Sequence, residues 1–282
     1  MGLVKMCTLM NRAKENGVGC GSFSVYSMEA LMGTVKAAEE LETPVILQLA
    51  EARFSTAPLE LMGPMMISAA KNAKVEIAVH LDHGRSMDVI QKALKLGFTS
   101  VMYDGSTLPF ETNITDSKVV KAMADHYNAD VEAELGLVGR GEGGGHDYGI
   151  QCTVPEDTKV FMEKTDVDAL AVAIGNQHGN YPSVPKLRFD ILKDIHMAIP
   201  ETHLVLHGGS GITDSDFREC IRNGVTKINI ATAILNSMVD RAGGYLAGAG
   251  PFTYYGMNKE MVSGAYEVVK HHIKVFNMKE NL

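Results

Sequence analysis

One pattern runs the whole length of the chain and constrains the fold more than any other feature. Apolar segments of strand length alternate with segments in which apolar residues recur every three or four positions, and we count eight such pairs. The predicted strands are 21–26, 44–50, 75–83, 100–105, 130–136, 169–175, 202–209 and 227–233. The predicted helices include 28–41, 86–96, 111–127, 155–164 and 214–223, with a further helix at 259–276.

Most of these strands are apolar on both faces, which is typical of parallel strands covered by helices. Eight consecutive strand–helix units without a linker predict a closed (β/α)8 barrel, a TIM barrel, as a single domain over residues 1–282. A doubly wound open sheet uses the same local pattern and remains the alternative. Signals at the helix ends agree with the pattern, because Thr213 with Asp216 resembles a capping box and Gly97 and Gly224 are expected in the left-handed conformation.

Composition argues against several classes of partner. Asp and Glu outnumber Lys and Arg by 34 to 26, and the formal charge of −8 argues against a nucleic-acid-binding surface. No run of 18 apolar residues occurs, so we expect no membrane segment and no cleaved leader. The four cysteines are far apart and include no CxxC pair, which favours a reducing cytoplasm. Because the net charge is negative, an anionic ligand must be held by groups close to its binding site.

Polar residues close six of the predicted strands. In a closed barrel the C-terminal ends of the strands form the rim that carries the active site. Three histidines at these ends, His83, His178 and His207, are a sufficient ligand set for a catalytic Zn²⁺, which keeps its fourth position open. His80, two residues before Asp82, is expected to point into the barrel as packing or supporting material, and we leave it out of the site.

Two glycine-rich segments follow predicted strands. In 206–211, glycines permit close backbone approach, and Ser210 with the N–H groups at the helix start after Thr213 can hold an anion; a helix-entry turn without a ligand is the alternative. The segment 139–149 matches GxGxxG but is not followed by a helical pattern, so it does not predict a dinucleotide site. We interpret it as a flap that carries Glu142 as a base, against a solvated loop with an incidental acid.

Together these residues resemble the class II, metal-dependent ketose-bisphosphate aldolases, which include the fructose- and tagatose-bisphosphate enzymes. The resemblance covers nearly the whole chain and is carried by segments 81–84, 131–136, 168–179, 206–211 and 227–232. It implies an aldehyde-lyase that reversibly cleaves a phosphorylated ketose, a 1-phosphate or a 1,6-bisphosphate, to dihydroxyacetone phosphate and an aldehyde. It also implies Zn²⁺, a monovalent cation near the phosphate, and a homodimer or homotetramer.

The resemblance further implies a role for each candidate residue. The zinc ligands are matched by His83, His178 and His207. The acid that exchanges a proton with the aldehyde oxygen and the flap base that abstracts a carbon-bound proton are matched by Asp82 and Glu142. The carboxylates that hold a second or displaced ion are matched by Asp104 and Glu134. The dihydroxyacetone phosphate pocket is matched by Gly179, Gly208, Gly209, Ser210, Asn229, Ala231 and Thr232.

Departures from the family pattern concern the substrate. Ser24 and Ala50, both expected at the open rim, replace a common Asn and Ser, Pro182 stands where a lysine is often found, and Lys259 is an uncertain counterpart of an arginine that binds the distal phosphate. The flap sequence is also altered. These changes resemble a divergent subgroup whose aldehyde half is a longer sugar or sugar acid without a phosphate, rather than fructose 1,6-bisphosphate.

Two other functions account for part of the pattern. A non-catalytic barrel that binds a sugar phosphate is consistent with the altered flap and rim. A zinc hydrolase shares the histidines but leaves the segments 206–211 and 229–232 without an explanation.

Overall fold

The computed structural model describes residues 2–139, 149–181 and 183–279. Its parallel strands pair in chain order, and β1 also pairs with β8, from Cys20 opposite Lys227 to Phe23 opposite Ile230. The strands are β1 (Cys20–Ser24), β2 (Val45–Ala50), β3 (Ile77–Gly84), β4 (Ser100–Tyr103), β5 (Asp130–Leu135), β6 (Ala169–Val172), β7 (His203–Leu206) and β8 (Val225–Ile230). This closure confirms the predicted barrel and excludes the open sheet.

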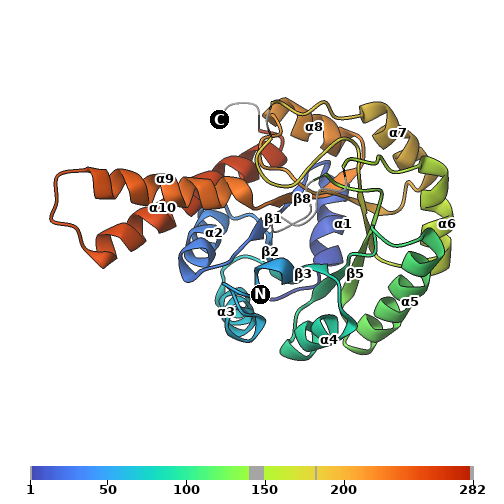
Figure 1. Ribbon diagram of the computed structural model, residues 1–282, viewed down its shortest axis with the longest axis horizontal. Helices are drawn as coiled ribbons and strands as arrows, with labels where there is room; N and C mark the ends of the chain where they lie inside the picture. The colour runs from blue at the N-terminus through green and yellow to red at the C-terminus, as the bar shows by residue number, and fades with distance from the viewer. Residues whose placement is uncertain (1, 140–148, 182, 280–282) are drawn as a thin grey trace.

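Helices form a ring around the barrel (Figure 1). They are α1 (Met6–Asn16), α2 (Met28–Glu40), the 3-10 turn η1 (Glu51–Arg53), α3 (Leu59–Asn72), α4 (Met87–Leu96), α5 (Phe110–His126), α6 (Pro155–Thr165), α7 (Phe189–Ala198), α8 (Asp214–Arg222), α9 (Thr232–Ala247) and α10 (Tyr254–Phe276). The predicted helix ends are confirmed: the Thr213 hydroxyl accepts a hydrogen bond from the Asp216 amide, and Gly97 and Gly224 have φ of 95° and 96°. Among the described helices, none has the length and apolar character needed to cross a membrane.

Several predicted strands extend too far, and the largest differences, of three residues each, are in the last three strands. β6, β7 and β8 end at Val172, Leu206 and Ile230, rather than at 175, 209 and 233. Gly175 and Gly208 have positive φ of 99° and 66°, a conformation outside the strand region, so the polar ends of β6 and β7 belong to loops. β8 is cut short because α9 begins two residues after it. The loops place these polar residues above the barrel instead of in its wall.

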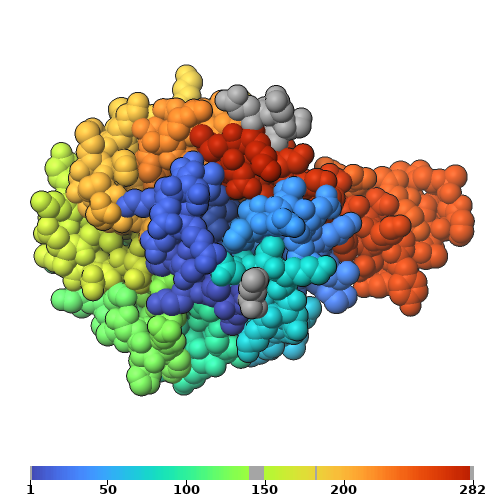
Figure 2. All heavy atoms as spheres, turned by 180° about the vertical axis from the view of Figure 1, so that it is seen from behind, coloured from blue at the N-terminus to red at the C-terminus, as the bar shows by residue number. Residues whose placement is uncertain are grey.

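Side chains alternate between the two faces of each strand, and this alternation separates the outer core from the barrel interior. Leu47 and Val79 belong to the main apolar core, whereas their neighbours Ile46 and Ala78 belong to a separate cluster with α1. In that cluster α1 contributes its buried residues Met6, Leu9, Met10 and Ala13. Figure 2 shows the N-terminal segment that contains α1, in blue, near the middle of the rear face. α1 therefore closes one end of the barrel and leaves the other end for the site.

α9 and α10 form a hairpin that projects from the barrel (Figure 1). α10 begins at Tyr254 rather than at 259, because the Thr253 hydroxyl caps it by accepting a hydrogen bond from the Gly256 amide at 3.0 Å. Its inner part packs against α2 so closely that a Cβ on Gly33 would lie 2.7 Å from the Val262 carbonyl oxygen. The outer end of the hairpin, where α9 is connected to α10, projects beyond the ring of helices (Figure 1).

The hairpin also holds a buried titratable group. His272 lies against Phe217 and Phe276, with ring centroids 5.8 and 5.7 Å away, and its Nδ1 lies 2.8 Å from the Val268 carbonyl oxygen. Burial lowers the pKa of His272 to about 4. A histidine in the unfolded chain titrates near 6.5, so between these two values the unfolded state binds more protons than the folded state.

We expect the free energy of unfolding to fall as the pH decreases from about 6.5 to 4, by ~3 kcal/mol from this residue at about 1.4 kcal/mol per pKa unit. His272→Asn keeps a donor for Val268 and removes this titration. Urea unfolding at pH 7 and pH 4.5 should therefore show a smaller pH dependence in His272→Asn than in the wild type or in the exposed-site control His126→Asn. An equal pH dependence in all three proteins would contradict the assignment.

Candidate metal and substrate site

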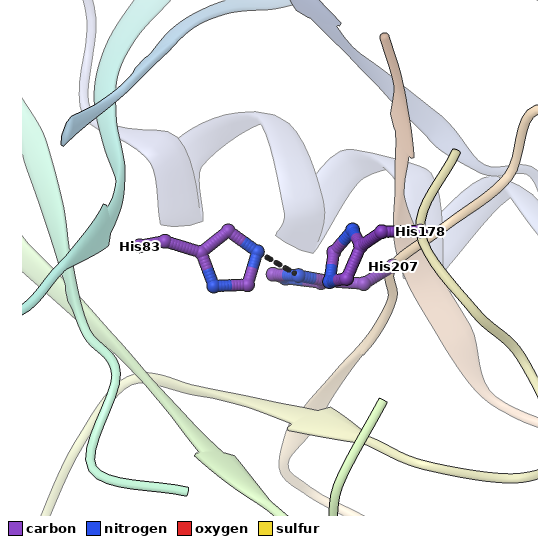
Figure 3. Close-up of side chains that lie close together, drawn as sticks. All are labelled: His83, His178 and His207. Atoms are coloured by element: carbon purple, nitrogen blue, oxygen red, sulfur yellow. Dashed lines mark hydrogen bonds between the residues drawn. The ribbon is translucent and has the colours of Figure 1, made fainter. Parts of the chain in front are cut away.

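Three histidines from different loops and strands meet at the open end of the barrel (Figure 3). His83 lies at the end of β3, His178 in the loop after β6, and His207 directly after β7. Each offers one ring nitrogen to a cluster in which all three atoms lie within 4.8 Å of one another. His207 Nδ1 and His83 Nε2 lie 2.9 Å apart. All three side chains are buried.

His83 reaches this cluster through a local irregularity in β3. Adjacent strand residues point to opposite faces, so Asp82 and His83 would not both face the site in a regular strand. The pairing of β3 with β4 changes register between Leu81 and Gly84, and His83 has φ of 46°. A left-handed conformation is uncommon for a non-glycine residue and is found at sites where the surroundings enforce it. The irregularity thus brings two consecutive candidate site residues, Asp82 and His83, to the same place.

The histidine cluster fits a zinc ion. Zn²⁺ binds imidazole nitrogens at about 2.0–2.1 Å, which in tetrahedral geometry separates the nitrogens by about 3.4 Å. The observed ligand atoms lie within 4.8 Å of one another, so small side-chain rotations would complete the geometry. Three imidazoles leave a fourth position for water or substrate. A second group, formed by His83, Asp104 and Glu134, also has its ligand atoms within 4.8 Å, and it contains both carboxylates expected to hold a second ion.

Carboxylates orient two of the histidines. His83 Nδ1 lies 3.0 Å from Asp104 Oδ2, and His207 Nε2 lies 2.7 Å from Glu132 Oε1. An ionised carboxylate only accepts hydrogen bonds, so each of these nitrogens carries the proton and the opposite nitrogen faces the cluster. Metal-binding histidines are held by carboxylates in this way in many metalloproteins. Glu132 was not among the site residues predicted from the sequence.

Burial and neighbouring charges together shift the pKa values of the titratable groups in the cluster. Burial lowers the pKa of His83, but the nearby carboxylates of Asp82 and Asp104 outweigh it and raise that pKa to about 10. Burial would raise the pKa of Glu132, yet Lys227 and the hydrogen bond from His207 hold it well below its usual range. Burial, reinforced by Asp104, raises the pKa of Glu134 to about 8. The group is therefore electrostatically suited to a cation, which favours ionised carboxylates and neutral imidazoles.

A pocket with an empty volume of about 280 Å³ opens beside the histidines. It is lined by Gln48, Asp82, His178, Gly179, Gly208, Gly209, Ser210, Asn229, Ala231 and Thr232. Every residue predicted to bind dihydroxyacetone phosphate is in this lining. Gln48 was not predicted, although it follows Ile46 by two positions and therefore shares its inward face. Gln48 and Asn229 each donate an amide hydrogen bond to the Asp82 carboxylate, at 3.1 and 3.2 Å.

The two loops that form the pocket are tied together. The Tyr181 hydroxyl accepts a hydrogen bond from the Gln177 amide and donates one to the Gly208 carbonyl oxygen, both at 2.9 Å. A Cβ on Gly208 would lie 2.1 Å from the Gln177 carbonyl oxygen, so glycine is required there. The helix terminus in the lining is that of α9, where the Ala233 amide donates to the Ser210 hydroxyl at 2.9 Å. The sequence predicted that the helix start after Thr213, which is the start of α8, would hold the anion. Among the described residues, those that line the pocket include the start of α9 instead.

The remaining predicted site residues belong to the expected flap, to the loop after β6 and to the ends of β1 and β2. Glu142 and Pro182 lie outside the described residues. The first residue of the expected flap, Gly139, accepts a hydrogen bond from the His178 amide at 2.8 Å, so this end of the segment lies beside a zinc-ligand candidate. Ser24 and Ala50 are the last residues of β1 and β2, at the end of the barrel that carries the site, and both are fully buried. The Ser24 hydroxyl accepts a hydrogen bond from the Gln48 amide at 3.0 Å, and Ala50 is paired with Asp82.

The comparison with protein families agrees with this geometry. The model of the family "Fructose-bisphosphate aldolase class-II" matches residues 4–281. The chain belongs to this family.

Lys259, the residue considered for the distal phosphate, is an exposed residue of α10.

Relatives within the family have different names. The chain is 36% identical to the sulfofructosephosphate aldolase of Alkalicoccus urumqiensis over 229 residues, which cover 80% of this chain and 79% of that protein. It is 38% identical to the fructose-bisphosphate aldolase of Staphylococcus aureus over 237 residues, with 82% of each chain covered. The crystal structure of the YdjI aldolase of Escherichia coli K12 superposes with a TM-score of 0.87, 33% identity and 97% coverage of both chains. Membership in the class II aldolases is thus shared by relatives named for different substrates.

Proposed function

We propose that the protein is a zinc-dependent aldolase that reversibly cleaves a ketose 1-phosphate or 1,6-bisphosphate to dihydroxyacetone phosphate and an aldehyde. The observation that carries this proposal is the direct contact between the histidine cluster and the pocket, because His178 belongs to both. A metal-independent aldolase requires a lysine that forms an imine, and no lysine lines this pocket among the described residues. The family membership supports the same reaction class.

His83, His178 and His207 would hold the zinc ion. When bound, Zn²⁺ supplies Lewis-acid chemistry that polarises the substrate carbonyl and stabilises developing negative charge. Asp82 takes the proton from the hydroxyl at the carbon that becomes the aldehyde, and returns it in condensation. The family resemblance assigns Glu142 as the base that removes a carbon-bound proton in condensation. Two carboxylates with separate proton-transfer roles account for both directions of the reaction.

The phosphate of dihydroxyacetone phosphate would bind between Gly208–Ser210 and the N-terminus of α9. Backbone N–H groups at a helix N-terminus favour an anion without any positively charged side chain. This is consistent with the net charge of −8. A monovalent cation beside the phosphate and a second ion at Asp104 and Glu134 are parts of the same proposal.

The test is an aldehyde panel offered with dihydroxyacetone phosphate and the zinc-loaded protein. Phosphorylated, neutral and carboxylated acceptors are compared by mass spectrometry of the condensation products. We expect condensation with at least one class and a preference for a sugar or sugar-acid acceptor without a phosphate. Hydrolysis of esters or amides in place of condensation would instead indicate a zinc hydrolase.

Proton exchange separates an enzyme from a non-catalytic barrel that binds the same ligand. In deuterated water, we expect the zinc-loaded protein to exchange a carbon-3 proton of dihydroxyacetone phosphate without any aldehyde present. Binding of the ligand without exchange would favour the non-catalytic alternative. The exchange reaction also removes the unknown aldehyde from the experiment.

We further propose that the hairpin contacts a second copy of the chain. Its outer part exposes Val239, Leu246, Phe252, Tyr254 and Tyr255, at 48–83%. An apolar patch of this kind on a projecting element is typical of a protein interface, and most oligomers are symmetric. We expect sedimentation of the wild type as a dimer or tetramer and a smaller species for Leu246→Glu with Tyr255→Glu. A monomeric wild type would contradict the proposal.

A further inference from the structure

Three titratable side chains lie deeper in the barrel than the zinc-ligand candidates, and the proposed reaction gives them no role. Glu132, Lys227 and His80 are completely buried. Lys227 Nζ lies 2.8 Å from Glu132 Oε2, and His80 Nε2 lies 3.6 Å from the same oxygen. Replacing a buried ion pair with apolar side chains is often neutral or stabilising. Stability alone therefore does not account for this pair.

The pair contacts a candidate zinc ligand directly. Glu132 Oε1 is 2.7 Å from His207 Nε2, while the opposite ring nitrogen, Nδ1, faces His83. With Lys227 as a partner, Glu132 is held as an acceptor, so the proton of a neutral His207 belongs on Nε2. Nδ1 then presents its lone pair at the position where the ion would bind. In metalloproteins such hydrogen bonds set both the tautomer and the ring orientation of a ligand.

The same lysine also acts on the other side of the site. Lys227 Nζ donates a hydrogen bond to Asn229 Oδ1 at 2.8 Å, and Asn229 Nδ2 donates to Asp82 Oδ1 at 3.2 Å. An ammonium group has donors only, so it determines which end of the Asn229 amide faces it. The NH₂ group is thereby directed toward Asp82. One buried cation thus lies between a candidate zinc ligand and the candidate proton-transfer residue.

We propose that Glu132 and Lys227 are positioning residues, which hold His207 with Nδ1 toward the metal and, through Asn229, hold the Asp82 carboxylate in place. This proposal rests on the proposed function, because it takes His207 as a zinc ligand. Neither residue lines the pocket, so neither touches the substrate.

A different role for Lys227 is also considered, because a lysine inside a barrel can form an imine with a ketose. Its ammonium lies between Glu132 and Asn229, and its side chain has no exposed surface. An imine would require the carbonyl carbon to reach Nζ past Asn229. These contacts occupy Nζ on the side of Glu132 and on the side of Asn229, and formation of the imine is one outcome of the experiment.

The test compares two double variants. Glu132→Gln with Lys227→Met removes both buried charges at nearly constant volume, whereas Glu132→Gln alone would leave the lysine charge unpaired. The control is Asp130→Asn with Lys5→Met. It makes the same kinds of change at another ion pair of β5, in which Lys5 Nζ lies 2.8 Å from Asp130 Oδ1 at the start of the strand. Circular dichroism checks that both variants are folded before any measurement.

Two readouts are taken. Zinc affinity is measured by competition with a chromophoric chelator, and the tautomer of His207 is measured in the metal-free protein by nitrogen-15 chemical shifts. We expect about 10–100-fold weaker zinc binding in the Glu132→Gln/Lys227→Met variant, as for other hydrogen-bond partners of metal ligands. We expect the wild type to hold the Nε2–H form and this variant to show a mixture. The control should match the wild type in both.

The outcomes separate this proposal from the proposed function. Wild-type zinc affinity and tautomer in the folded Glu132→Gln/Lys227→Met variant would overturn the positioning role and leave the zinc aldolase intact. A borohydride-stable adduct of dihydroxyacetone phosphate on Lys227 would also overturn it. If the wild type binds no zinc, the proposed function and the metal-positioning role both fail, even where the tautomer readout still detects the hydrogen bond to Glu132.

Discussion

Removal of the metal is expected to abolish aldol cleavage. His178→Ala is also expected to abolish it, and added metal should not restore the activity of this variant. Losing several kcal/mol of transition-state stabilisation lowers the rate by about 10³-fold or more, at about 1.4 kcal/mol for each factor of ten. Of the candidate ligands, His178 is the suitable one to change, because it lies on a loop and retains 8% exposure, whereas His207 is fully buried against Glu132. The fold should therefore survive the substitution.

The measurement is the rate of dihydroxyacetone phosphate release before and after treatment with a chelator, together with the zinc content of each protein. Added zinc should restore the treated wild type but not His178→Ala. His126→Ala, at an exposed position on α5, is the matched control and should behave as the wild type. Full activity in metal-free protein would exclude the zinc mechanism.

Asp82→Asn is expected to reduce kcat by about 10²–10⁴-fold, the usual contribution of a general acid or base. The asparagine has nearly the same size, so it removes proton transfer with little change in packing. Gln48 and Asn229 both donate to the present carboxylate, and an asparagine side chain can accept only through its single oxygen. Some reorientation within the pocket is therefore part of the expected effect.

Steady-state kinetics and zinc content distinguish the two contributions. We expect normal zinc content, a large loss in kcat and a smaller change in KM. Asp88→Asn makes the same chemical change at an exposed position in α4, directly after β3, and should leave both parameters unchanged. A wild-type kcat in Asp82→Asn would remove Asp82 from the mechanism.

Features that depend on interactions between residues close in the sequence could be predicted, and features that depend on contacts between distant residues could not. Strand and helix positions depend on local periodicity, and the order of eight units led to the barrel. The ends of β6 and β7 were predicted too late, because the chain leaves the strand conformation before Gly175 and Gly208, which have positive φ. The end of β8 was predicted too late because α9 begins two residues after it. The start of α10 was missed because its cap, Thr253, precedes the apolar pattern of the helix.

The residues at the rim of the candidate site could be predicted from the sequence, but the contacts beneath them could not. Histidines after successive strands mark a rim, since the barrel brings all strand ends together. Nothing local indicates that Glu132 would meet His207, which is 75 positions away. The pairing of Glu132 with Lys227 depends on which inward positions of β5 and β8 lie at the same depth in the closed barrel, and strand order alone does not determine that depth.

For this protein, the sequence by itself determined the alternation of strands and helices, the family resemblance and the side chains available at the rim. These features depend on residue type and spacing within short segments. Only the tertiary structure decided that His83 turns inward beside Asp82, that Gln48 and Asn229 both hold that carboxylate, and that a buried lysine lies between two parts of the site. The reason is that such contacts join residues far apart in the chain, whose distance is set by closure of the barrel and a local change of register.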